Sequence, residues 1–384
     1  MIVVPDGIQF FAGVLIGIMA LLYVMGAVYA MRRWGRRRMQ LASNLPPVTV
    51  LKPLHGIEHG LYENLRSFCD QDYPEFQIIF GAHNPDDPAL NVARRLEKEF
   101  PDRQFDIVVD PRLHGGNHKA SNLANMMGRA RHGYVIAADA DIRVGRDYLS
   151  CLMGPLQEPG TGVVTCLYRA RPWAGLWSVL GAESINNGFA PSVLVAHFLG
   201  SRSYCSGATM GLRRATLEAI GGFSTVSQHL ADDYLLGALA RRQGLRTVLS
   251  PYVVETTVDE PSIRSFLSHE LRWLRTIRTL EPWGYLFSGI TYALPVSLLG
   301  AALARSRPAV LILPFVVLLF RVMLYFETRR KKTMGVCGSP LWVIPVRDFV
   351  SFGLWIAGFA SRRVRWQGRN LSVRPDGHIE ANKE

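Results

Sequence analysis

Two aspartates separated by one residue directly follow an apolar run that predicts a buried strand. The run covers residues 134–138, and Asp139 and Asp141 come next. Two carboxylates at this spacing can both reach a hard cation if the loop turns away from the strand, and Mg²⁺ or Mn²⁺ prefers such oxygen ligands. The alternative is an exposed acidic loop without function, because an isolated Asp-x-Asp is common. We predict a Mg²⁺ or Mn²⁺ site at this pair.

A glycine-rich segment that ends in a lysine lies just upstream. Residues 115–119 read Gly-Gly-Asn-His-Lys and lead into a predicted helix at 120–131. Backbone N–H groups of such loops, together with a lysine ammonium, bind phosphate oxygens. Lys119 is therefore predicted to bind a pyrophosphate, and its position favours the functional interpretation of Asp139 and Asp141.

A second acidic pair, Asp232 and Asp233, opens an apolar-periodic helix predicted at 235–242. One interpretation is a helix N-cap with an acid that the helix dipole favours, worth about 1 kcal/mol. The other is a catalytic carboxylate held in a cleft. The residues by themselves leave both interpretations open.

The segment 265–279, SFLSHELRWLRTIRT, predicts a helix that carries His269, Arg272 and Trp273. It has the arginines and tryptophan of an interfacial amphipathic helix at the level of lipid headgroups. Arg272 could also neutralise a leaving diphosphate while Trp273 stacks on an acceptor. These two interpretations are compatible with each other.

The elements that must position these residues form an α/β pattern with a largely parallel sheet between residues 46 and 273. Ligands of such sheets bind outside the carboxyl ends of the strands, where Asp87 and Asp139 fall. Predicted strands cover residues 48–52, 77–82, 105–109 and 134–138, and predicted helices cover 61–69, 89–100 and 120–131.

Apolar segments on both sides of this region predict membrane helices. Residues 8–31 are uncharged and long enough to cross a bilayer, and arginines follow, so we predict an uncleaved anchor with its N-terminus outside. A signal peptide fits poorly because the charges follow the apolar run. Residues 283–304 and 308–326 predict a helical hairpin interrupted at 305–307.

Three charges in the C-terminal apolar segments leave alternatives open. Arg321 lies inside the second arm, where it either snorkels to the interface or pairs inside the bundle. The segment 341–360 contains Arg347 and Asp348 and is either a re-entrant or interfacial helix or a third crossing.

Composition narrows the class of partner. The net charge is +12, with 48% apolar and 19% charged residues, and the cations lie beside apolar stretches. This distribution of charge favours a bilayer surface as the partner, and we exclude nucleic acid as a partner. The five cysteines lie far apart without a CxxC pair. We therefore expect reduced thiols, and we expect neither a disulfide framework nor a zinc site.

Six segments, taken in order, resemble the ceramide glucosyltransferase family. They are LKPLHG at 51–56, DDPA at 86–89, NHKASNL at 117–123, ADADIRV at 138–144, ADDY at 231–234 and HELRW at 269–273. The family consists of inverting glycosyltransferases with the GT-A fold, and its pattern is three aspartates followed by (Gln/Arg)-x-x-Arg-Trp. The resemblance implies that fold, a UDP-sugar donor and a membrane lipid acceptor.

The resemblance also implies roles for single residues. Asp233 would be the general base, and Asp139 and Asp141 would hold the metal and the diphosphate. The other donor-binding or acceptor-binding positions would be Asp87 at the nucleotide end and His269, Arg272 and Trp273 as a clamp. The sequence departs from the pattern at His269, where Gln or Arg is usual. Asp141 is present although some eukaryotic members lack it.

The segment HELRWLRTIR resembles the bacterial branch, which includes hopanoid-biosynthesis glycosyltransferases. We therefore expect N-acetylglucosamine transfer to a bacteriohopanetetrol-type lipid at the cytosolic face of a bacterial inner membrane. A ceramide glucosyltransferase using UDP-glucose is the alternative. A processive polysaccharide synthase would need more membrane helices, and a non-enzymatic scaffold would be expected to have lost one of the acids.

The expected domains are an anchor at 1–40, a cytosolic GT-A domain at 46–280 and a C-terminal membrane block at 281–384. The region between Arg169 and Ser203 is expected to shape the acceptor entrance, because it carries Trp173 and Trp177 among many small residues.

Overall fold

The computed structural model describes residues 5–39, 41–304, 308–330, 334–336, 338–361, 363–366, 369–374 and 377–381. The chain forms two compact units, each built from separate stretches of sequence. The sheet unit comprises Arg38–Arg169, Ser201–Thr257 and Leu371–Glu384, and the helical unit comprises Met1–Arg37, Ala170–Gly200 and Val258–Asn370. The predicted domain boundaries stay predictions.

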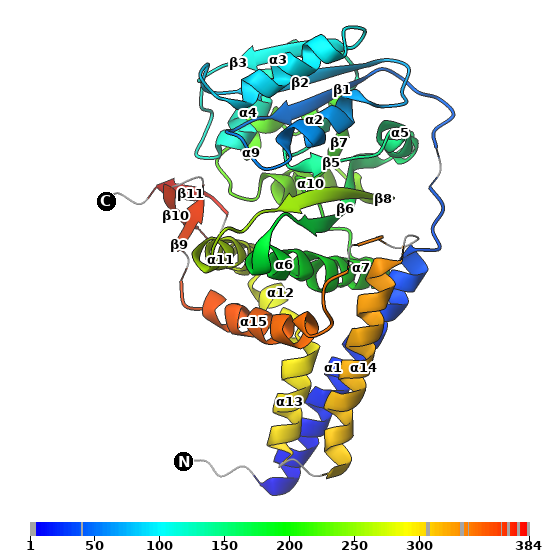
Figure 1. The fold of residues 1–384 in the computed structure, drawn as a ribbon, viewed down its shortest axis with the longest axis vertical. Coiled ribbons are helices and arrows are strands. Elements are labelled where there is room, and N and C mark those ends of the chain that lie inside the picture. The colour runs from blue at the N-terminus through cyan, green and yellow to red at the C-terminus, as the bar shows by residue number, and fades with distance from the viewer. Residues whose placement is uncertain are drawn as a thin grey trace. The chain divides into compact units, whose positions relative to one another are not determined.

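A mixed sheet forms the centre of the sheet unit (Figure 1). Among the described residues its strand order is β3-β2-β1-β4-β7-β6-β8-β5. The half from β3 to β4 is parallel, whereas β7 pairs antiparallel with both β4 and β6. The strands are β1 (Val48–Pro53), β2 (Phe76–Ala82), β3 (Gln104–Val109), β4 (Tyr134–Ala137), β5 (Ile142–Arg143), β6 (Thr161–Pro172), β7 (Met210–Arg213) and β8 (Arg246–Val258).

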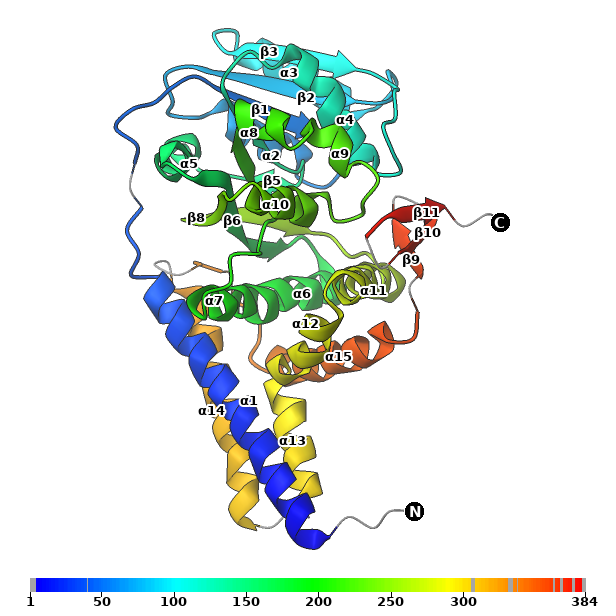
Figure 2. The same ribbon diagram turned by 180° about the vertical axis from the view of Figure 1, so that it is seen from behind.

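Helices cover both faces of this sheet. One face packs against α2 (Leu61–Cys69), α3 (Ala89–Glu99) and α5 (Tyr148–Gln157), and the opposite face, seen in Figure 2, packs against α4 (His118–Met126), α8 (Arg214–Ala219), α9 (Gly222–Val226) and α10 (Asp232–Arg242). β2 is buried along its whole length, as a strand covered on both faces must be. The short C-terminal strands are β9 (Arg363–Trp366), β10 (Arg369–Val373) and β11 (Ile379–Ala381).

The predicted α/β fold is confirmed, but the sheet is parallel only from β3 to β4 and not largely parallel as expected. One helix is also shorter than expected. The helix predicted at 120–131 ends at Met126 and continues as a 3₁₀ turn, Met127–Arg129. Gly128 lies in this turn, and glycine in a helix costs about 1 kcal/mol relative to alanine, so the tighter turn replaces the last α-helical residues.

In the helical unit, α1 (Asp6–Trp34), α13 (Ala293–Leu303) and α14 (Pro308–Arg329) lie side by side (Figures 1 and 2). α1 and α13 approach closely at Gly13 and Gly300, where a Cβ on Gly13 would lie 2.3 Å from the Gly300 carbonyl oxygen. Such small-residue contacts are typical of membrane helix pairs. Among the described residues, Asp6–Trp34 and Val310–Arg329 are long and apolar enough to cross a membrane.

The first arm of the predicted hairpin is not one straight helix. It consists of α12 (Pro282–Phe287), a 3₁₀ turn (Ser288–Thr291) and α13, with a 79° bend between Pro282–Thr291 and Ala293–Leu303. Pro295 lies in the first turn of α13, where its missing N–H needs no partner, so the helix restarts there. The predicted interruption at 305–307 lies outside the described residues.

Arg321 pairs inside the bundle and does not snorkel. Its guanidinium donates two hydrogen bonds to Asp348, at 2.8 and 2.5 Å, and one to the main-chain carbonyl of Asn187. Asp348 belongs to α15 (Val343–Gly358), which runs across α13 and α14 rather than alongside them. With 16 residues and two buried charges, α15 fits the predicted interfacial helix better than a third crossing.

The rest of the helical unit contains the segments around the predicted acceptor entrance and the HELRW motif. Trp177 packs on Phe266, whereas Trp173 is 46% exposed. Their predicted role at the acceptor entrance stays a prediction. The helices are α6 (Gly175–Ser184), a π-helix (Ile185–Phe189), α7 (Ala190–Phe198) and α11 (Ile263–Leu280).

Candidate active site

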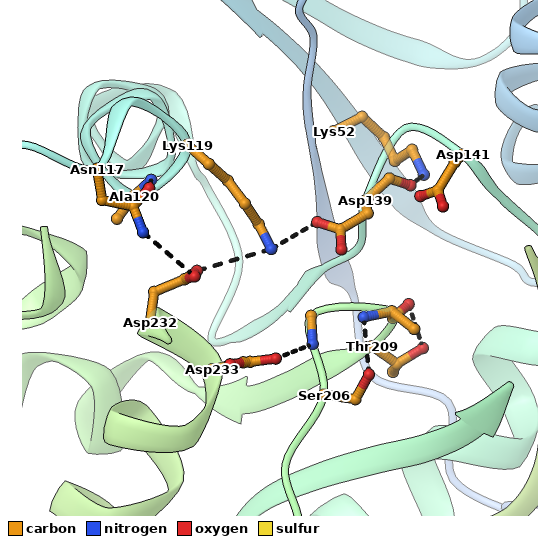
Figure 3. Close-up of polar contacts among 12 residues, drawn as sticks. Lys52, Asn117, Lys119, Ala120, Asp139, Asp141, Ser206, Thr209, Asp232 and Asp233 are labelled. Atoms are coloured by element: carbon orange, nitrogen blue, oxygen red, sulfur yellow. Dashed lines mark hydrogen bonds and ion pairs between the residues drawn. The ribbon is translucent and has the colours of Figure 1, made fainter. Parts of the chain in front are cut away.

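Asp139 follows the end of β4 and faces Lys119 from the start of α4 (Figure 3). The Lys119 ammonium lies 2.5 Å from Asp139 Oδ1 and 3.6 Å from Asp232 Oδ2. Burial by itself lowers the pKa of Lys119, but the charges of Asp139, Asp232 and Asp233 outweigh burial and raise it. Lys119 is therefore a permanent cation at the centre of an acidic cluster.

Asp141 lies on the other side of the same loop. Thr256 Oγ1 donates to Asp141 Oδ2 at 2.6 Å. Burial and the neighbouring Asp139 charge raise the pKa of Asp141, with the Thr256 hydrogen bond opposing them. Two carboxylates whose charges repel each other in this way are stabilised when a cation binds between them.

The donor chemistry of this pair fits a divalent cation that also binds substrate. In the described part of the chain, no group of three or more His, Cys, Asp or Glu side chains forms a metal site. Mg²⁺ is commonly held by one or two carboxylates together with substrate phosphates and water. Asp139 and Asp141 would be the carboxylate ligands of such an ion, and substrate phosphates and water would be the others.

Asp233 lies in the first turn of α10, whose N-cap is Ala231. Neither aspartate is the N-cap, so that part of the interpretation was wrong, but both lie in the first turn, where the helix dipole favours an acid. Asp233 Oδ2 accepts the N–H of Gly207 at 2.8 Å, and Oδ1 accepts the N–H of Tyr234 at 2.7 Å. Burial, aided by the Asp232 charge, raises the pKa of Asp233 to about 6. At neutral pH it is an ionised carboxylate of raised basicity.

One glycine connects these groups. Gly207 donates its N–H to Asp233, and its carbonyl accepts the N–H of Asp139 at 3.3 Å. A Cβ at Gly207 would lie 2.5 Å from Lys119 Nζ and 2.8 Å from Asp139 Oδ2. The aspartates at 139 and 233, almost a hundred residues apart, thus share one backbone residue as a contact.

Sequence reasoning missed three further members of the cluster. Asn117 caps α4 and donates to Asp232 Oδ1 at 3.3 Å, so it holds α4 and α10 together. Asp232 was considered only as half of a pair. Lys52, at the end of β1, donates to the main-chain carbonyl of Asp139, and burial lowers its pKa to about 7. The sequence feature that could have indicated Lys52 is a charged residue within an otherwise apolar and β-branched predicted strand.

Asp87 lies apart from these contacts. Both of its carboxylate oxygens accept the N–H of Gly56, at 3.1 and 3.0 Å, and Oδ1 also accepts the N–H of Ala89. Gly56 has a φ of +68°, which favours glycine. Asp87 therefore holds the loop after β1 against the start of α3.

His269, Arg272 and Trp273 lie together on α11 in the helical unit. His269 Nδ1 is 2.7 Å from Glu260 Oε1, and the His269 and Trp273 rings meet edge to face at 4.5 Å. Glu260 was not predicted. Burial alone would raise its pKa, but the hydrogen bonds from His269 and Ser265 hold the pKa below its ordinary value, so Glu260 is ionised.

A solved structure shares the fold of this chain. A mannosyltransferase from Pyrobaculum calidifontis, solved with GDP-Man and Mn²⁺, superposes with a TM-score of 0.54 at 21% sequence identity, covering 88% of this chain and 99% of that one. The fold is therefore that of the GT-A glycosyltransferases.

The chain belongs to glycosyl transferase family 21, which it matches over residues 12–379. Ceramide glucosyltransferase 1 of Caenorhabditis elegans is 22% identical over 380 residues, which are 96% of this chain and 80% of that protein. An N-acetylglucosaminyltransferase of Rhizobium meliloti is 23% identical over 241 residues, 60% of this chain and 56% of that protein. The family resemblance is confirmed: this is a sugar-transferring enzyme.

Proposed function

We propose that this chain is an inverting glycosyltransferase that moves a sugar from a UDP-sugar to a hydroxyl of a membrane lipid. The observation that carries the proposal is the Gly207 contact, because it sets a basic carboxylate, Asp233, beside the Lys119 and Asp139 pair. An acceptor-activating base and a diphosphate-binding cation are the two groups that such a transfer needs.

The reaction is one in-line displacement at the anomeric carbon. The acceptor hydroxyl oxygen forms the new C–O bond, the bond from the anomeric carbon to the diphosphate oxygen breaks, and UDP leaves. Asp233 accepts the hydroxyl proton, since each of its oxygens keeps a lone pair free after accepting one N–H. Lys119 offsets the charge of the leaving diphosphate. A divalent cation at Asp139 and Asp141, when bound, would supply further charge neutralisation.

The remaining predicted residues keep their predicted roles in this proposal. Asp87 serves the nucleotide end by holding the loop at Gly56. His269, Arg272 and Trp273 contact the donor and the acceptor. In this proposal the membrane helices anchor the protein in a bacterial inner membrane, and sugar transfer takes place on the cytosolic side.

The preferred substrates are UDP-N-acetylglucosamine and a hopanoid of the bacteriohopanetetrol type. The similarity to the N-acetylglucosaminyltransferase of Rhizobium meliloti and the HELRWLRTIR segment support this pair. Ceramide and UDP-glucose are the alternative, supported by the Caenorhabditis elegans relative.

The test is mass spectrometry of products from detergent-purified protein with Mg²⁺ or Mn²⁺, offering each of the two UDP-sugars with each of the two lipids. A hexosamine added to the hopanoid supports the preferred pair, and a hexose added to ceramide supports the alternative. A ladder of sugar additions would indicate a polymerase. If protein that still binds UDP gives no product in any of the four reactions, both substrate assignments are contradicted. Asp233→Asn is the negative control.

A further inference from the structure

A group of arginines lies at the end of α1, outside the candidate active site. Tyr29, Arg32, Arg33, Arg36 and Arg37 follow the spacing i, i+3, i+4, i+7, i+8, which places them on one face of α1 and of the turn after it. They line a cavity of about 450 Å³. We call these five residues the arginine face.

Aromatic side chains hold two of these arginines in place. The guanidinium carbons of Arg33 and Arg37 both lie 5.5 Å from the centre of the Phe198 ring, at the end of α7. Arg37 also lies 4.9 Å from the Trp34 ring centre and 3.2 Å from His197 Nε2. Because two guanidinium groups share one ring, their charges repel each other unless an anion lies between them.

The carboxylate beside this face does not balance its charge. Glu327 pairs with Arg32 at 2.8 Å and with Arg330 at 3.2 Å, so its charge is already shared by two cations. Within the described ranges, neither Arg33 nor Arg36 forms an ion pair. The cavity therefore has an excess of positive charge.

The position of the face indicates which anion it binds. α1 is a candidate membrane span, and the arginines follow its apolar part. Tyr29, one turn earlier, is 61% exposed, as expected of an aromatic residue at headgroup level. Guanidinium groups bind phosphate oxygens in a bidentate manner.

We infer that the arginine face binds the phosphate headgroup of an anionic phospholipid of the surrounding bilayer. The inference is independent of the proposed function, since it involves none of the residues assigned to sugar transfer. The site would hold a bound lipid at the cytosolic end of the anchor.

Native mass spectrometry of the full chain tests this inference. The protein in detergent micelles is offered phosphatidylglycerol or phosphatidylcholine with the same acyl chains, and lipid retention is measured. Arg33→Gln/Arg36→Gln is compared with Arg362→Gln/Arg363→Gln, which removes the same charge from the segment after α15. Circular dichroism checks that both variants are folded.

The wild-type chain and the Arg362/Arg363 variant should retain phosphatidylglycerol in preference to phosphatidylcholine. Arg33→Gln/Arg36→Gln should lower that affinity roughly 30-fold, since each cation contributes about 1 kcal/mol. Equal retention of both lipids by the wild type would overturn the inference, as would equal losses in the two variants. Displacement of the lipid by inorganic phosphate would assign the site to a soluble anion instead.

Discussion

Asp233 is a half-buried carboxylate that must be ionised to accept a proton. Its pKa is raised to about 6, so kcat/KM should fall as the pH drops through about 6 and level off above it. Asp233→Asn should lower kcat by about 10² to 10⁴ and remove this acid limb. Asp86→Asn, an exposed neighbour of the acidic loop at Asp87, is the control and should keep the wild-type profile. An unchanged limb in Asp233→Asn would assign the base elsewhere.

Gly207 leaves no room for a side chain beside Lys119 and Asp139. Gly207→Ala would push the Lys119 ammonium and the Asp139 carboxylate out of place. We expect kcat/KM to fall by about tenfold or more, because small displacements of catalytic groups are costly, while the melting temperature changes little. Gly128→Ala is the matched control, since a Cβ there meets nothing within 4 Å. Equal activity of the two variants would refute this account.

Glu260 orients His269, whose Nδ1 donates to it. Glu260→Gln should raise the KM for the UDP-sugar severalfold, because the imidazole loses its fixed orientation. In a His269→Gln background, Glu260→Gln should have little further effect on that KM. Additive effects in this double-mutant cycle would mean that Glu260 acts only on the stability of the unit. Thermal unfolding of each variant provides the comparison.

At the scale of elements, the Arg321 and Asp348 pair joins α14 to α15. Both side chains are buried, so removing one partner leaves an unpaired charge. Asp348→Asn should lower the free energy of unfolding by about 3 to 5 kcal/mol. The double variant Arg321→Met/Asp348→Leu should recover a large part of that loss. Denaturant unfolding in detergent, followed by tryptophan fluorescence, measures the free energy of unfolding of both variants. A smaller loss of stability in Asp348→Asn than in the double variant would contradict the pairing.

At the scale of the whole molecule, α1 and α13 run side by side, so their ends near Gly13 and Ala304 lie together. Single cysteines at the exposed positions Asp6 and Leu303 should therefore react with a membrane-impermeant maleimide from the same side of the membrane. A cysteine at the exposed Asp86 should react only from the opposite side. The native Cys69, Cys151, Cys166 and Cys205 are buried, and burial raises their thiol pKa values, so they contribute little background. Cys337 is replaced by serine.

Labelling of the Asp6 and Leu303 positions from opposite sides would contradict the packing of α1 against α13. Labelling of the Asp86 position from the same side as both would contradict the proposed cytosolic location of Asp86.

The sequence by itself determined strands β1 to β4, helices α2, α3, α4 and α10, and the location of Asp139 and Asp141 after a buried strand. Local apolar periodicity sets these features, because burial on one face or two requires a particular spacing of apolar residues. The membrane helices α1 and α14 follow from length and hydropathy in the same way.

Only the tertiary structure decided which distant residues meet. Lys119 lies between Asp139 and Asp232, Gly207 contacts Asp233, and Arg321 pairs with Asp348 instead of snorkelling. No spacing rule links these positions, since the contacts arise when separate helices and strands are packed. Buried charges must find partners in the folded chain, and which partner is within reach depends on the packing of whole elements.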